Sequence, residues 1–111
     1  MDRERLNAQN MQVCFLIQAM CGAVTPNWRS VLMTFDGDEV HLQFILEQES
    51  TEDREEIEDV VEEFSIFQED ARPYRLGITN VTVTAEKLQL QQHPSSRLIY
   101  RRKESAERSG R

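Results

Sequence analysis

Histidine and cysteine, the residues most often used in catalysis and metal binding, are few and widely spaced in this sequence. His41 lies in a predicted strand and His93 lies beside a proline in a predicted turn, so we expect both to be structural. Cys14 and Cys21 fall seven residues apart on a predicted helix. That spacing is about 10 Å along the helix axis, too far for a disulfide. No histidine stands near either cysteine at zinc-ligand spacing, and we expect both thiols to be buried as small hydrophobes in a reducing compartment.

Other signatures of enzymes and cation sites are also missing from the sequence. The acidic run at residues 36–39 could suggest a cation loop, but it lacks the twelve-residue ligand pattern. Asp36-Gly37 between two apolar runs is instead typical of a β-hairpin. The sequence contains no glycine-rich phosphate loop and no nucleophile motif. We therefore expect no enzyme, no metal and no cofactor. A small metal-dependent hydrolase, whose activity a chelator would abolish, is the enzymatic alternative.

Carboxylates are the abundant chemical group, and they are concentrated in one segment. Residues 47–70 contain twelve acidic residues and one basic residue, a net charge of −11, within a chain of net charge −7. The remaining twelve basic and eight acidic residues therefore carry +4. This balance argues against direct binding to nucleic acids or anionic membranes, which requires clustered Lys and Arg. A straight helix directs its carboxylates apart, whereas a specific cation site needs oxygens that converge.

The segment that follows Ser50 is predicted to be the helix that positions these carboxylates. Its apolar residues recur at helical spacing: Ile57, Val60, Val61, Phe64 and Phe67. Ser50 is the predicted N-cap, with Thr51 as a second candidate. The side away from the apolar stripe is predicted to bind a partner through seven residues: Glu52, Glu55, Glu56, Asp59, Glu62, Glu63 and Ile66. We call the six carboxylates of this set the acidic face.

The carboxylates of this predicted helix are destabilising by themselves. Four like-charge pairs stand at i,i+4: Glu52–Glu56, Glu55–Asp59, Glu58–Glu62 and Asp59–Glu63. Together they cost on the order of 1–2 kcal/mol. The pattern is compatible with a solvated helix face that keeps the chain soluble, or with a docking surface for a basic partner.

Ile66 and Trp28 have two interpretations each. Ile66 is either an apolar anchor among the charges or, if the helix has begun to unwind, a core residue. Trp28 and Arg29 form a second candidate contact. A tryptophan at the start of a strand is, however, more typical of the edge of a core.

An earlier helix is predicted between Leu6 and Cys21, ended by Gly22 and Pro26. Residues 1 to about 7 before it are polar and charged, and we expect them to be frayed. One helical face carries Leu6, Asn10, Val13, Cys14, Ile17 and Cys21. Further apolar residues extend the apolar sector beyond half of the circumference. We expect this helix to be largely buried, or partly buried against a second chain, which leaves a homodimer open.

Strands are predicted at residues 27–35, 40–47, 74–85 and 97–103, where apolar residues alternate or cluster. The order α-β-β-α-β-β gives an α+β fold, with a four-stranded antiparallel sheet and two helices on one face. Residues 1–104 are expected to form one domain, and residues 105–111 a disordered tail. No signal peptide or membrane-spanning run is present, which favours a soluble cytoplasmic protein.

Four runs of residues resemble a known class of protein: 25–31 (TPNWRSV), 35–47 (FDGDEVHLQFILE), 50–59 (STEDREEIED) and 98–104 (LIYRRKE). They are similar to the small immunity proteins of bacterial contact-dependent growth inhibition and related polymorphic toxin systems. The likeness extends over most of residues 10–104.

The resemblance implies a protein that binds one cognate toxin domain in the cytoplasm and blocks it, often by covering its active site. Many such toxins are nucleases, whose substrate channels are basic, so the acidic face would complement one. The alternative is an acidic nucleic-acid mimic or adaptor that binds a host nucleic-acid-binding protein. A gene position directly downstream of a large secreted toxin would favour immunity.

Overall fold

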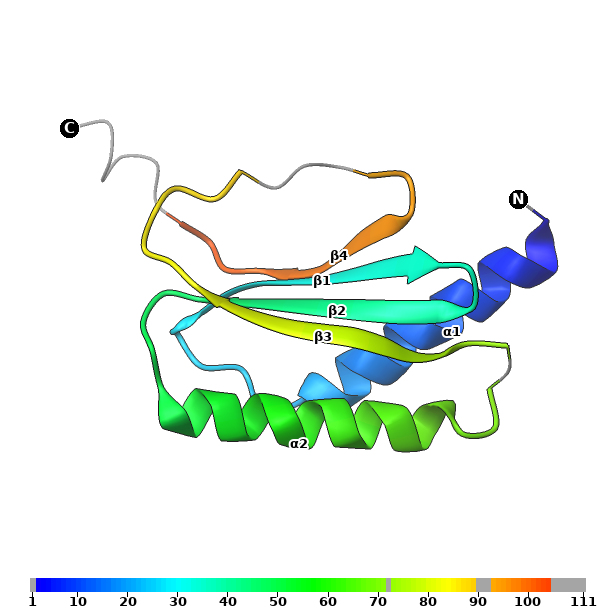
Figure 1. Cartoon of the computed structure of the whole chain (residues 1–111), viewed down its shortest axis with the longest axis horizontal. Helices are drawn as coiled ribbons and strands as arrows, with labels where there is room; N and C mark the ends of the chain where they lie inside the picture. The colour runs from blue at the N-terminus through cyan, green and yellow to red at the C-terminus, as the bar shows by residue number, and fades with distance from the viewer. Residues whose placement is uncertain (1, 72, 90–92, 105–111) are drawn as a thin grey trace.

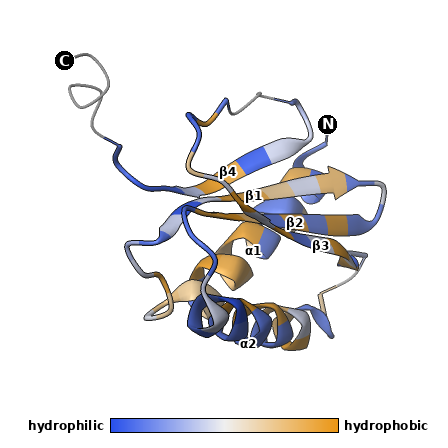
Figure 2. Cartoon of the chain, turned by 60° about the vertical axis from the view of Figure 1, so that its left-hand side comes forward, coloured by the Kyte–Doolittle hydropathy of each residue, from blue (hydrophilic) through white to orange (hydrophobic). Residues whose placement is uncertain are grey.

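The computed structural model describes residues 2–71, 73–89 and 93–104. The elements in chain order are α1 (Arg3–Met20), β1 (Trp28–Asp36), β2 (Glu39–Leu46), α2 (Thr51–Gln68), β3 (Arg75–Val83) and β4 (Ser96–Arg101). Both helices lie on the same side of one four-stranded sheet (Figures 1 and 2). The predicted α+β class and the α-β-β-α-β-β order are therefore confirmed. The expected tail at residues 105–111 lies outside the described residues.

The sheet is mixed, so the prediction of an antiparallel sheet was wrong. The strand order is β3-β2-β1-β4. β1 is antiparallel to both β2 and β4, whereas β2 and β3 are parallel. Helix α2 returns the chain to the starting end of β2, and this helical crossover is how parallel neighbours are normally joined. Alternating apolar residues give a strand its two faces but carry no information about the direction of its neighbour.

The core lies between the sheet and the two helices. On the α2 side, Ile57, Val60 and Phe64 are buried, as the apolar stripe predicts. Trp28 is fully buried and packs edge-on against Phe44, with ring centroids 5.7 Å apart. The interpretation of Trp28 as a surface contact was therefore wrong.

Helix α1 buries a different face from the one predicted. Its buried residues are Gln9, Gln12, Leu16, Ala19 and Met20. The predicted stripe turns outward: Leu6 and Ile17 are exposed, and so are both thiols, which contradicts the expectation of buried cysteines. The two glutamines are buried because they find polar partners: the Gln68 amide donates to Gln12 at 2.6 Å, and Gln9 accepts from the Arg97 guanidinium at 3.5 Å.

Local signals in the sequence fix the ends of several elements. Asp2 accepts a hydrogen bond from the Arg5 N–H at 2.7 Å, so α1 begins at Arg3 and the predicted fraying of residues 3–7 was wrong. Gly22 follows the end of α1 with φ of 84°, and Gly37 opens the hairpin turn with φ of 60°. None of the described helices is long and apolar enough to cross a membrane.

Candidate functional site

The acidic face lies along the solvent side of α2. All six of its carboxylates are exposed: Glu52, Glu55, Glu56, Asp59, Glu62 and Glu63. Figure 2 shows this helix lined with hydrophilic residues. Ile66 is 55% exposed, so the alternative that it turns into the core was wrong. Sequence periodicity thus placed all seven predicted residues on the accessible side of one helix.

The acidic face has no internal counter-charge. None of its six carboxylates forms an ion pair with a Lys, Arg or His among the described residues. The single basic residue of the segment, Arg54, donates instead to Glu49, outside the helix. This hydrogen bond is the main cause that lowers the pKa of Glu49 and raises that of Arg54. The like-charge repulsion inferred from sequence is therefore left uncompensated in the isolated chain.

The first turn of α2 is fixed by a polar network that holds it to the segment before β1. The Ser50 hydroxyl caps the helix by accepting from the Asp53 N–H at 3.1 Å, which confirms the predicted N-cap. The Asp53 carboxylate, only 5% exposed, accepts from the Thr25 hydroxyl at 3.0 Å and from the Asn27 amide at 2.9 Å. Asn27 also exchanges two hydrogen bonds with the Gln48 backbone, at 2.8 and 2.9 Å. This network fixes the orientation of α2 relative to the segment before β1, and therefore the direction in which the acidic face points.

Arg29 is a buried tie between three segments, so its interpretation as a partner contact was wrong. Its side chain is 4% exposed and binds both carboxylate oxygens of Glu104, at 2.7 and 2.8 Å. It also donates to the carbonyls of Thr84 and Glu86, each at 2.7 Å. The guanidinium thus joins β1 to the segment after β3 and to the segment after β4. Sequence reasoning missed the pairing because Arg29 and Glu104 stand 75 residues apart.

The hydrogen bonds from Arg29 lower the pKa of Glu104 from its ordinary 4.5 to about 2, with Arg102 adding to the effect. The same pair raises the pKa of Arg29. When the pH falls below 4.5, the unfolded chain protonates Glu104 while the folded chain keeps it ionised. The stabilisation by the pair is therefore complete above about pH 4.5 and is lost as the pH falls toward 2.

We predict that the difference in free energy of unfolding between the natural chain and Glu104→Gln is constant from pH 7 to about 4.5 and then shrinks toward pH 2. Urea denaturation of both proteins at several pH values measures this difference, and the subtraction cancels the other carboxylates. A difference that does not change with pH would show that the carboxylate is not held by Arg29.

The histidines and cysteines form no reactive centre in the described part of the chain. His41 accepts the Ile78 N–H through Nδ1 at 2.8 Å, at the irregularity where Gly77 and Ile78 interrupt the β2–β3 register. His93 accepts the Ser95 N–H at 3.1 Å. No three His, Cys, Asp or Glu residues of the described ranges gather as a metal-ligand set. Both histidines thus serve the local backbone.

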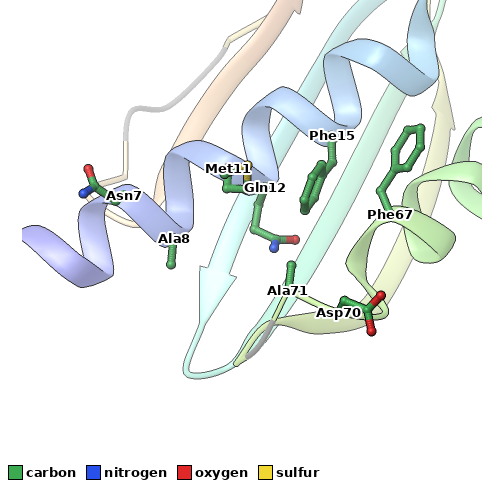
Figure 3. A pocket seen from close by; sticks show the side chains of 8 residues that line it. All are labelled: Asn7, Ala8, Met11, Gln12, Phe15, Phe67, Asp70 and Ala71. Atoms are coloured by element: carbon green, nitrogen blue, oxygen red, sulfur yellow. The ribbon is translucent and has the colours of Figure 1, made fainter.

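An apolar groove opens between α1 and the end of α2, beside the acidic face (Figure 3). Its volume is about 460 Å³. It is lined by Asn7, Ala8, Met11, Gln12, Phe15, Phe67, Asp70 and Ala71. The sequence gives no sign of this groove, because its lining comes from two helices more than fifty residues apart whose packing has no local signal.

The described residues thus place a carboxylate-covered helix beside an apolar groove. Comparison with protein families gives the class: the model of the MafI2 immunity proteins matches residues 9–104. The chain belongs to the MafI2 immunity protein family. Its cognate partner is therefore a toxin, and the resemblance seen in the sequence is confirmed at that level. No curated protein sequence matches the chain.

Proposed function

We propose that this chain neutralises a cognate toxin of nuclease type in the cytoplasm by covering the toxin's basic active site with the acidic face of α2. The growth-inhibition or related polymorphic toxin system indicated by the sequence would supply this toxin. The observation that carries the proposal is the uncompensated charge of the face: six exposed carboxylates without an ion-pair partner among the described residues.

The inhibition would be occlusion without chemistry. A nuclease binds the phosphates of its substrate through Lys and Arg, and carboxylates on a rigid helix can pair with the same side chains. With 18 residues, α2 is about 27 Å long, enough to lie across a substrate channel. In a toxin bound to this helix, those Lys and Arg side chains would no longer be available to bind nucleic acid.

The charge also explains why a destabilising surface would be kept. Opposite charge on two proteins raises the association rate, up to 10⁸–10⁹ M⁻¹s⁻¹ at low salt from about 10⁵–10⁶ for uncharged surfaces. An immunity protein must capture its toxin before the toxin finds nucleic acid, so a rapid encounter is useful. Binding would also relieve the repulsion among the four like-charge pairs.

We predict that Glu55→Lys/Asp59→Lys/Glu62→Lys weakens binding to the toxin domain encoded beside this chain's gene by about 100-fold at low salt. The dependence of affinity on salt should become much shallower, because fewer opposite charges meet in the complex. Isothermal titration at several salt concentrations measures both quantities, and toxin activity on nucleic acid measures protection.

The matched control is Glu4→Lys/Asp36→Lys/Glu86→Lys, which changes the net charge equally at exposed positions outside α2. It should bind with nearly natural affinity. If the α2 variant binds as tightly as the natural chain, with the same salt dependence, the acidic face serves only solubility and the proposed mechanism is wrong.

A further inference from the structure

The groove between α1 and α2 exposes apolar surface at the edge of the core. Met11 is 52% exposed, and the rings of Phe15 and Phe67, which pack against each other with centroids 5.8 Å apart, also line the groove. Figure 3 shows these side chains around one opening, with Ala8 and Ala71 leaving room at its edge. A concave apolar surface of this kind is the usual receptor for one large side chain of a partner.

The groove is preformed. Gln12 lies in its lining, and the buried hydrogen bond from the Gln68 amide to Gln12 ties α1 to α2 at 2.6 Å. Since that bond is buried, breaking it would leave two amides without partners, which is costly. The separation of the two helices is therefore held, and a ligand would find the groove open without paying for reorganisation.

The rim of the groove is negative. Asp70 lines it directly. Glu63 stands one helical turn before Phe67, and Glu56 stands two turns before Glu63, so both lie on the same flank of α2 as Phe67. Both are exposed. The groove is thus continuous with the acidic face. The negative charge of its rim favours a ligand that carries positive charge beside its apolar part.

We propose that this groove receives a large apolar side chain of the toxin, from a segment that places Lys or Arg against Glu63 and Asp70. The inference rests on the proposed function and adds the anchor of that interface. Charge complementarity chooses this occupant: a second copy docked through the same face would bring its own Glu63 and Asp70 to a negative rim. The acidic face would set the rate of encounter, and the groove would set how long the complex lasts.

The test uses the toxin domain encoded beside the gene and two kinds of groove variant. Met11→Gln removes the apolar wall without adding charge, and Ala71→Phe fills the opening. Each should weaken toxin binding about tenfold, mainly through faster dissociation, with the salt dependence unchanged. Ile17→Gln is the matched control, because Ile17 is also 52% exposed on α1 but does not line the groove. It should bind as the natural chain does.

The outcomes separate the groove from the acidic face. If both groove variants bind normally while the α2 charge reversals weaken binding, the groove inference is overturned and the proposed function stands. If the groove variants change only self-association, measured by analytical ultracentrifugation, the occupant is a second copy and the inference is likewise overturned. Circular dichroism and thermal unfolding establish that each variant is folded before binding is measured.

Discussion

Replacing Arg29 with methionine should lower the free energy of unfolding by about 3 kcal/mol. The buried guanidinium makes four hydrogen bonds, two to Glu104 and one each to the carbonyls of Thr84 and Glu86. Methionine fills a similar volume but leaves the two carbonyls without this donor. The three segments that Arg29 connects, which are β1, the segment after β3 and the segment after β4, would lose these hydrogen bonds.

Urea denaturation at pH 7 measures the loss, and Arg101→Met is the matched control. Arg101 is exposed at the end of β4 and forms no ion pair with a described residue, so its replacement should change stability by less than about 0.5 kcal/mol. Equal effects of the two substitutions would mean that the Arg29 tie contributes no more than a surface charge.

The elements of this fold that were predictable from the sequence are those with local signals. The N-cap at Ser50 and the glycine after α1 depend on contacts a few residues apart, and both are where the sequence predicts them. The side of α2 that is buried follows from a stripe with polar residues on every other side. The spacing of the apolar residues therefore also predicts which side of α2 faces the solvent.

The incorrect predictions concern contacts between distant segments. Helix α1 has apolar residues over more than half of its circumference, so its pattern did not decide whether Leu16 or Ile17 faces the sheet. The face that is buried includes Gln12, whose partner Gln68 lies 56 residues away. The parallel pairing of β3 beside β2 is likewise decided by where α2 returns the chain, and strand alternation does not record this.

The runs that carry the resemblance to immunity proteins supply much of the buried polar framework. Thr25, Asn27 and Asp53 form the network at the start of α2, and Arg29 and Glu104 form the tie at the end of the sheet. These side chains position the surface without belonging to it.

Replacing Asp53 with alanine should destabilise the chain by about 3 kcal/mol, because a nearly buried carboxylate accepts hydrogen bonds from Thr25 and Asn27. Hydrogen bonds to charged groups contribute about 1.5–3 kcal/mol each. Without the carboxylate, the Thr25 hydroxyl loses this acceptor and the Asn27 amide keeps only the Gln48 carbonyl. Asp53→Asn should fall between the two proteins, since it keeps the shape but presents an NH₂ group to one of the donors.

Glu52→Ala is the matched control, because Glu52 is adjacent, acidic and exposed. It should change the free energy of unfolding by less than about 0.5 kcal/mol, and its effect should appear in toxin binding instead. By this prediction the Asp53 carboxylate serves stability, whereas the neighbouring Glu52 carboxylate serves toxin binding. If Asp53→Ala and Glu52→Ala lowered the free energy of unfolding equally, this assignment would be wrong. If an Asp53 variant stayed stable but lost toxin binding, Asp53 would belong to the binding interface.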